Sequence, residues 1–344
     1  MHRTLVTLFA LTAALAGAPA AGAAQAPAES IAVWTQRLQS PTLADRVQGM
    51  GRLAGEDPRS FPPATQSAIL AELTRVNEAL QSNVPIDGAT ALGSEGFGEY
   101  YLDLARTARS LNTPEANRAL ILSVGVSLGT SRRVARLGDG AIPSLAHMID
   151  QDYEPGAALE TMGLAWFWAD STGAVLSDAS RGVIVRALLA SSQSGSDELR
   201  SSVGPAFRWT GDPAFLPLAQ AIAARAQVSG DLLLSAAYFR INTLPSLTAA
   251  LNKLGPLGSA VRTRRVLGLV CSGTTSGARQ GACESLENEL DAAIAHLQAG
   301  RTGPAANVLE AVARRADAAV AIGALTQDEA ALIAGGARQV IARL

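Results

Sequence analysis

Residues 286–297 decide the fold class, and they read Leu286-Glu287-Asn288-Glu289-Leu290-Asp291-Ala292-Ala293-Ile294-Ala295-His296-Leu297. The large apolar side chains recur at spacings of three and four residues, which places them on one face of an α-helix. Leu70, Leu73, Val76 and Leu80 repeat the pattern far upstream. Strict apolar–polar alternation, the signature of a half-buried strand, is hard to find in the sequence. We therefore predict an all-α protein.

A weak internal repeat runs through the middle of the chain. Segments 135–145 and 237–247 both place Pro-Ser-Leu eight residues after an alanine, and segment 206–218 shares Gly-Asp-x-Ala with the first. Each is followed by an apolar helical pattern. A single helix pair of this kind cannot bury its apolar face alone, so neighbouring pairs are expected to stack.

One unit of this repeat resembles a known family. The residues Leu-Gly-Asp-Gly-Ala-Ile-Pro-Ser-Leu at 137–145, closed by Leu-Glu-Thr-Met-Gly at 159–163, resemble a HEAT-type repeat. Asp139 is expected to cap the first helix, and Pro143 is tolerated in its first turn. The resemblance implies an α-solenoid of irregular HEAT-like helix pairs, within a helical repeat domain that we delimit at residues 30–265.

The sequence pattern changes at Cys283, where three leucine- and alanine-rich helical segments begin. A Leu-spaced helix ends near Gly300, a second helical pattern follows, and a Gly-Ala-Leu-Thr turn at 323–326 precedes a third. This order resembles FIMAH, a C-terminal helical module of secreted bacterial proteins. The resemblance implies a three-helix module over residues 283–344, in which Thr326 and Glu329 form a capping box.

The N-terminus has the three parts of a secretory signal. A short basic region ending at Arg3 is followed by an apolar run from Leu5 to Ala16, and then by small residues that include Ala21-Gly22-Ala23. We predict a signal peptide at residues 1–23, with cleavage after Ala20 or Ala26 as alternatives. The mature chain is then periplasmic or secreted. No later apolar stretch is long enough to span a bilayer, so no stable membrane anchor is expected after cleavage.

Cys271 and Cys283 are the only cysteines. Export would place them where disulfides form, and the residues between them are rich in turn formers. We predict one disulfide bond that closes a flexible linker over residues 271–283. Two reduced, buried thiols are the alternative.

The sequence lacks the residue sets on which common catalytic sites depend. Beyond the predicted signal only His147 and His296 remain as histidines, without a Gly-x-Ser-x-Gly elbow or paired metal-ligating histidines. No phosphate-loop or other cofactor motif is present. Glu95 and Glu99 could be imagined as glycosidase carboxylates, although a solvated helix start is the alternative. We therefore predict no catalytic residues, metal or cofactor, and the net charge of −2 argues against nucleic acid.

The aromatic residues suggest a binding surface. Three of the four tryptophans fall in segments 165–168 and 206–209. Consecutive helical residues point about 100° apart, so Trp166, Phe167 and Trp168 cannot all face one core. We predict a groove shared with segment 237–240, because aromatic and arginine side chains are frequent binding hot spots. The residues predicted to contact a partner are Trp166, Trp168, Phe207, Arg208, Trp209, Tyr238 and Arg240; core packing between repeats is the alternative.

Together these features predict an exported, non-catalytic protein of the bacterial cell envelope that binds or scaffolds another envelope protein. Two alternatives stay open at this point. One is a cell-envelope enzyme or enzyme accessory that acts on glycan or peptide. The other is a carbohydrate-binding module that uses the aromatic side chains.

Overall fold

A computed structural model describes residues 28–173, 175–272 and 277–344. Helices α1 to α17 account for most of these residues, and no strand occurs among them, which confirms the predicted all-α fold. No helix in this described part of the chain combines the length and apolar character needed to cross a bilayer. The predicted signal peptide at residues 1–23 lies outside the described residues. The chain divides into two compact units, one ending at Val126 and one running from Ser127 to Leu344.

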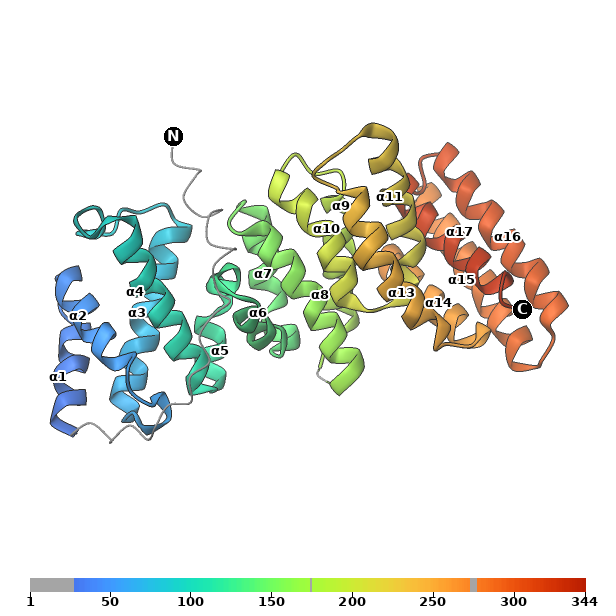
Figure 1. Cartoon of the computed structure of the whole chain (residues 1–344). Helices are drawn as coiled ribbons and strands as arrows, with labels where there is room; N and C mark the ends of the chain where they lie inside the picture. The colour runs from blue at the N-terminus through green and yellow to red at the C-terminus, as the bar shows by residue number, and fades with distance from the viewer. Residues whose placement is uncertain (1–27, 174, 273–276) are drawn as a thin grey trace. The chain divides into compact units, whose positions relative to one another are not determined.

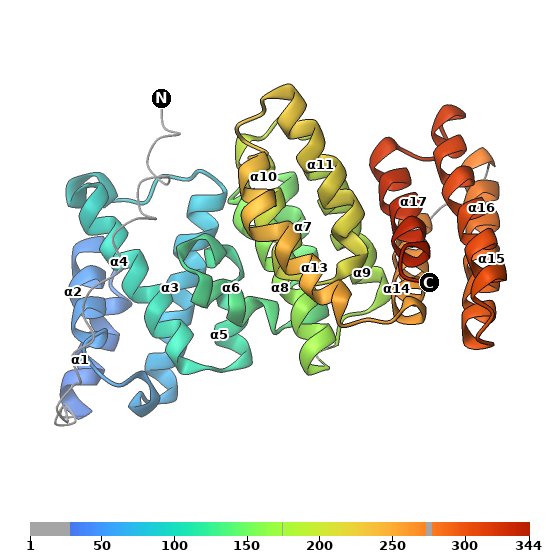
Figure 2. The ribbon, with the colours of Figure 1, turned by 45° about the vertical axis from the view of Figure 1, so that its right-hand side comes forward.

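The described residues of the first unit form five α-helices, namely α1 (Ala28–Leu38), α2 (Leu43–Leu53), α3 (Pro63–Gln81), α4 (Ala89–Leu111) and α5 (Pro114–Ala119). Helices α1 to α4 lie side by side in both views (Figure 1, Figure 2). Their apolar faces meet in a core that includes Leu38, Met50, Ile69, Leu73 and Leu104. Of the four residues predicted on one face of α3, Leu73 and Val76 are buried, whereas Leu70 is half-buried and Leu80 is exposed.

The buried carboxylate of Glu72 links helices α2, α3 and α4 of the first unit. Glu72 on α3 accepts two hydrogen bonds of 2.7 Å from Arg75 and one from the Tyr100 hydroxyl, and Arg46 Nε lies 3.0 Å from it. Burial, and then the neighbouring Glu72, raise the pKa of Tyr100, so its phenol stays protonated and donates. A carboxylate can be buried at low cost only when it is paired and hydrogen-bonded in this way.

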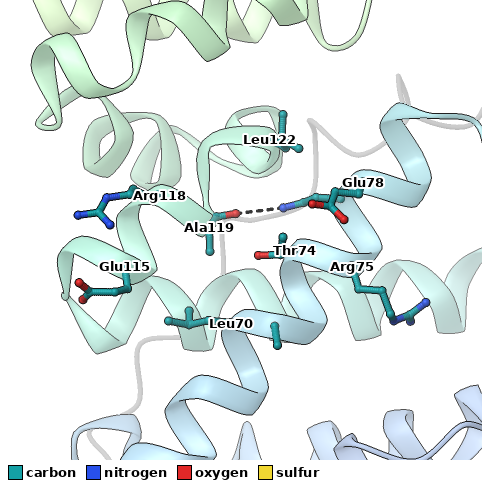
Figure 3. A pocket seen from close by; sticks show the side chains of 10 residues that line it. Leu70, Thr74, Arg75, Glu78, Glu115, Arg118, Ala119 and Leu122 are labelled. Atoms are coloured by element: carbon teal, nitrogen blue, oxygen red, sulfur yellow. Dashed lines mark hydrogen bonds between the residues drawn. The ribbon is translucent and has the colours of Figure 1, made fainter.

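A hollow of about 610 Å³ lies on the surface of the first unit between α3, α5 and the 3-10 turn Ile121–Val126 (Figure 3). Asn77 lies against it and ties the surrounding elements together. Its amide donates to the carbonyl of Ala119 (3.1 Å) and accepts from the hydroxyls of Tyr101 (2.7 Å) and Ser123 (3.1 Å). The charged side chains that line the hollow are Arg75, Glu78, Glu115 and Arg118.

The second unit begins with helices that alternate with short turns. They are α6 (Leu128–Ala135), α7 (Ile142–Asp150), α8 (Pro155–Thr172), α9 (Asp178–Ser191), α10 (Asp197–Thr210), α11 (Leu216–Ser229), α12 (Ala236–Tyr238), α13 (Leu244–Asn252) and α14 (Pro256–Cys271). Serine side chains cap α9 and α10: Ser177 accepts from Ser180 N–H, and Ser196 accepts from Leu199 N–H. These caps fix where the two helices start.

The turn at residues 138–139 differs from the expectation. Asp139 does not cap the helix that follows it; its carboxylate accepts from the N–H (2.8 Å) and hydroxyl (3.0 Å) of Ser177, directly before α9. Gly138 has a φ of +54°, and any Cβ there would collide with the carbonyl of Val175. The turn is therefore held against the α8–α9 connection. Pro143 does lie in the first turn of α7, as predicted.

Helices α8 and α10 are in direct backbone contact. A Cβ at Gly163 would lie 2.5 Å from the carbonyl oxygen of Ala206, and a Cβ at Gly156 would lie 2.9 Å from Cγ of Glu198. The contacts advance in the same direction along both helices, so α8 and α10 run parallel, with α9 between them in the chain. Only glycine allows this approach.

The C-terminal helices share one core with α14. Helices α15 (Gly277–Gln298), α16 (Thr302–Ala321) and α17 (Gln327–Ile341) are the three helices predicted there, and the Thr326–Glu329 capping box is present. Ala260 and Leu267 of α14 are buried in the same cluster. The apolar core therefore begins upstream of the boundary that we placed at residue 283.

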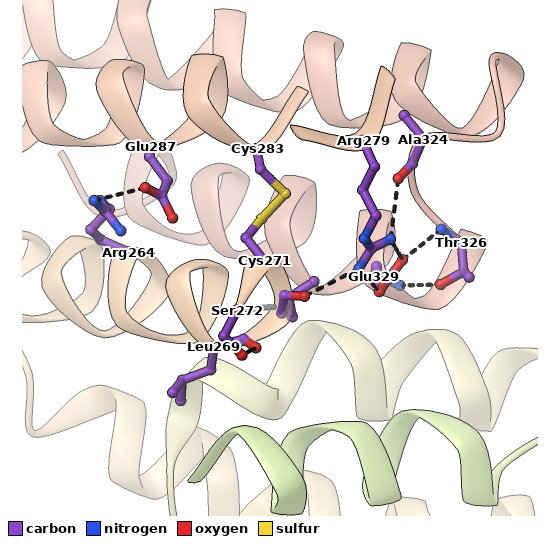
Figure 4. Close-up of a disulfide and its surroundings, with 11 residues drawn as sticks. Arg264, Leu269, Cys271, Ser272, Arg279, Cys283, Glu287, Ala324, Thr326 and Glu329 are labelled. Carbon is purple, nitrogen blue, oxygen red and sulfur yellow. Dashed lines mark hydrogen bonds and ion pairs between the residues drawn. A yellow bond between two sulfur atoms is a disulfide. The ribbon is translucent and has the colours of Figure 1, made fainter. Parts of the chain in front are cut away.

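The predicted disulfide joins Cys271 and Cys283, with a Cα–Cα distance of 5.9 Å (Figure 4). The predicted flexible linker is wrong for residues 277–283, because α15 already starts at Gly277. Arg279 anchors this first turn by donating to Glu329 (2.6 Å) and to the carbonyl of Val270 (3.1 Å). Residues 273–276 of the predicted linker lie outside the described part of the chain.

We predict that replacing both cysteines with serine lowers the free energy of unfolding by about 3 kcal/mol, the amount expected for a cross-link that closes a short loop. Urea denaturation of the oxidised protein and of the double variant measures this difference. A reducing agent should destabilise the wild type by the same amount and leave the variant unchanged. Equal stability of all samples would contradict the prediction.

Gly163→Ala should lower the free energy of unfolding by about 1–3 kcal/mol, because the new methyl group overpacks the α8–α10 contact. Gly281→Ala on α15 is the matched control, since no atom lies within 4 Å of its Cβ position. The control should stabilise the protein by up to about 1 kcal/mol, as alanine does in an open helix. Equal effects at the two positions would show that the contact is not tight.

Candidate partner-binding surface

Two of the predicted contact residues belong to the core. Trp166 has no exposed surface: it packs edge-on against Phe215 (5.2 Å between ring centroids), and its Nε1–H donates to Asp212 (3.1 Å). Phe207 is equally buried and packs against Phe215 (5.7 Å) and Phe239 (6.5 Å). Neither ring can touch a partner, so core packing is the correct interpretation for both.

Segment 237–240 does not join the other two segments in one groove. Tyr238 lies against Gly204 of α10, where its Cδ1 is 3.0 Å from a Cβ built on that glycine. Gly204 and Trp209 are five residues apart on the helix, so they point about 140° away from each other. The half-buried Tyr238 therefore belongs to another side of α10, and the groove does not form as predicted. Arg240 is exposed on the turn that follows Tyr238.

A strip of exposed and half-buried side chains does follow the contact between α8 and α10. On α8, Gly156, Glu160, Gly163 and Phe167 share one face at spacings of four, three and four residues. Trp168 points about 100° away from Phe167 along the helix, but the two ring centroids lie 6.0 Å apart. On α10, Glu198 and Trp209 lie beside this face. We call the set Glu154, Glu160, Phe167, Trp168, Glu198 and Trp209 the seam.

Contacts across the seam hold its side chains in place. The indole N–H of Trp209 donates to Glu160 Oε2 (3.2 Å), and Gly156 N–H donates to Glu198 Oε1 (3.1 Å). Phe167 rests against Gly211 just after α10, and 44% of its surface is exposed. The seam is thus built on two packed helices, which position side chains more rigidly than loops do.

Arginines cover two of the rings. The guanidinium of Arg136 lies 4.6 Å from the ring centroid of Trp168, and that of Arg208 lies 5.5 Å from Trp209. These are cation–π contacts, worth about 0.5–1 kcal/mol each at exposed positions. Neither arginine forms an ion pair among the described residues. The N–H of the Trp168 indole is enclosed and has no acceptor in the same part of the chain.

The other end of the seam is acidic. Burial, and then the nearby Glu198 carboxylate, raise the pKa of Glu154 to about 7. Burial also raises the pKa of Glu160 and Glu198, and Asp152 adds to the effect at Glu198. Within the described ranges no arginine, lysine or histidine forms an ion pair with any of these three glutamates. The charges at this end therefore repel one another without a cation to offset them.

A second polar cluster explains why Trp166 is buried. Asp170 accepts from Arg181 (2.8 Å) and from Arg262 (3.0 Å), and Arg262 also donates to Asp212 (2.9 Å). Arg181 in turn lies 4.7 Å from the Trp166 ring centroid. These ion pairs hold α14 and the start of α9 against the end of α8, so the cluster has a structural role.

No protein-family model, curated protein sequence or solved structure matches this chain. Among the described residues no group of three His, Cys, Asp or Glu side chains could hold a metal ion.

The prediction from sequence missed Glu154, Glu160 and Glu198. Each is an ordinary helix residue by pattern, and 38 residues separate Glu160 from Glu198 along the chain. Two signals were present, namely the glycines at 156 and 163, which have the spacing of a close helix contact, and Pro155, which marks the start of α8. Neither signal indicates that α10 is the helix that packs against α8, so the sequence does not predict that the three carboxylates lie close together.

Glu154→Gln should stabilise the protein above pH 7 and have little effect at pH 4. A carboxyl whose pKa is raised on folding binds its proton more tightly in the folded state, so stability falls as pH rises from about 4.5 to 7. The neutral amide of the glutamine does not ionise, so the variant does not lose this stability. We expect the difference in the free energy of unfolding to be about 1–2 kcal/mol after solvent screening. Thermal unfolding of both proteins from pH 4 to 8 measures the difference, and parallel stability curves would contradict it.

Proposed function

We propose that this protein is an exported, non-catalytic binding protein of the bacterial cell envelope that holds another protein at the seam. The observation that carries the proposal is the pair of indole rings capped by arginines next to the exposed Phe167 ring. Trp and Arg are the residues that most often carry binding energy at interfaces. Burial of such rings against a partner recovers the apolar area that they now leave in water.

Several further features support this proposal. The disulfide fits an oxidising compartment, as export through the predicted signal peptide would provide. The α-solenoid of HEAT-like helix pairs and the FIMAH-like module remain part of the proposal, and a solenoid would offer an extended surface for binding.

The experiment replaces Phe167 with photoreactive benzoylphenylalanine in the full-length chain, in the cells that produce it. Irradiation should give one adduct of defined mass with an envelope protein. Trp209→Ala in the same chain should reduce its yield about tenfold, the loss expected for one hot-spot residue, while Arg240→Ala should leave it unchanged. A photoreactive residue in place of Val228, which is 90% exposed on α11, should not give this adduct.

Stability measurements separate binding from core packing. Phe167→Ala and Trp209→Ala should melt close to the wild type, whereas Trp166→Ala should lose about 3–5 kcal/mol as a core tryptophan does. If all three variants melt equally low, the rings of the seam are structural and the proposed surface does not exist.

A glycan- or peptide-directed enzyme is the second candidate. One observation favours it: the pKa of Glu154, at about 7, suits a general acid that works near neutral pH. Hydrolysis of peptidoglycan fragments by the wild type, abolished in Glu154→Gln, would establish this activity. The carbohydrate-binding alternative predicts that the same fragments bind unhydrolysed and that Trp209→Ala abolishes their binding.

A further inference from the structure

The seam is acidic where α8 and α10 begin, and its basic side chains cover the aromatic rings farther along the two helices. Glu154, Glu160 and Glu198 cluster where α8 and α10 begin, and no basic side chain in the described ranges pairs with them. Arg208 near the end of α10 and Arg136, which covers Trp168 near the end of α8, have no carboxylate partner among the described residues either. The Phe167 ring is exposed, whereas the Trp209 ring is half-buried. Arg208 lies over the Trp209 ring and Glu160 accepts its N–H, so basic and acidic groups meet at this indole. This polarity is a property of the α8–α10 pair, because no segment of the sequence alone contains it.

The length of the seam limits what can cover it. Glu154 and Trp168 are fourteen residues apart along α8, which corresponds to about 21 Å at 1.5 Å per residue. An extended peptide advances about 3.3 Å per residue, so roughly six or seven residues span this distance. One linear segment of a partner is therefore sufficient to reach both charged ends.

We propose that the seam binds an extended segment of the partner protein, about six or seven residues long, that is basic at one end, apolar in its centre and acidic at the other. The inference rests on the proposed binding function and adds the chemistry of the segment. Lysine or arginine side chains lie over the three glutamates, and aspartate or glutamate side chains pair with Arg136 and Arg208. The apolar residues cover Phe167 and Trp209.

Charge complementarity is the reason for choosing this occupant. A uniformly basic segment would leave Arg136 and Arg208 facing like charges, and a uniformly acidic one would do the same at the glutamates; like charges juxtaposed at an interface oppose binding. Arginine–carboxylate pairs can be bidentate, which also fixes the position of the segment along the seam. A neutral glycan would leave the charges at both ends uncompensated.

The test uses fluorescence anisotropy with the intact, oxidised chain and a labelled, end-blocked octapeptide, Lys-Lys-Ala-Leu-Leu-Ala-Asp-Asp. Its control, Lys-Asp-Ala-Leu-Leu-Ala-Lys-Asp, has the same composition and net charge but no polarity. At low ionic strength the polar peptide should bind at least tenfold more tightly than the control. Raising the salt concentration should reduce the difference, because exposed charge pairs are screened.

Variants assign each end of the peptide to its site. Glu160→Gln with Glu198→Gln should weaken the polar peptide about tenfold, and so should Arg136→Ala with Arg208→Ala. Arg240→Ala is the matched control, an exposed arginine that is not part of the seam, and should change nothing. The inference is overturned if the polar peptide and the control peptide bind equally. It is also overturned if an all-lysine or all-aspartate octapeptide binds more tightly than the polar peptide.

The outcomes also separate this inference from the proposed function. If benzoylphenylalanine at position 167 captures an envelope protein but the polar peptide shows no preference, binding at the seam stands and the charge-polar segment is refuted. If the captured protein is a second copy of this chain, or if glycan fragments compete at the seam instead of peptide, the partner segment is refuted as well. Loss of peptide binding in both double variants, with wild-type melting temperatures, is the supporting result.

Discussion

The seam depends on one constraint, the direct contact between the backbones of α8 and α10. Gly156 and Gly163 leave no Cβ between the helices, so Ala206 and Glu198 can approach α8 closely. This proximity allows Trp209 to reach Glu160 and allows Gly156 N–H to donate to Glu198. A larger residue at either glycine would separate the helices and with them every pair of side chains that forms the seam.

Hydrogen-bond partners decide which aromatic rings are available for binding. Trp166 can be fully buried because Asp212 accepts its N–H, and Asp212 can be buried because Arg262 neutralises it. Phe207 needs no such partner and fills the core. Trp209 is half-buried and donates to a half-buried glutamate. Trp168 is also half-buried, and its enclosed N–H has no acceptor among the described residues. The cost of burying an unpaired polar group explains why Trp166 needs Asp212 as an acceptor.

The acidic end of the seam is unfavourable to folding at neutral pH. Burial raises the pKa of all three glutamates; Glu198 adds to the effect at Glu154 and Glu160, and Asp152 adds to it at Glu198. None of the three has a cationic partner in the described ranges. Elsewhere in the same chain buried carboxylates are neutralised, as Glu72 is by Arg75 and Arg46. Groups that lower stability without compensation are concentrated at functional sites, which supports the assignment of the seam to binding.

The sequence by itself determined the secondary structure of this protein and several local features. Helical spacing of leucines predicts the all-α fold, Thr326 and Glu329 predict the cap of α17, and the two cysteines predict the disulfide, because each depends on residues close together in the chain. Tertiary structure alone decided that Trp166 and Phe207 face the core, that Asp139 binds Ser177, and that three glutamates from α8 and α10 meet. Those outcomes depend on which helices pack together, and residues tens of positions apart carry no periodic signal of their pairing.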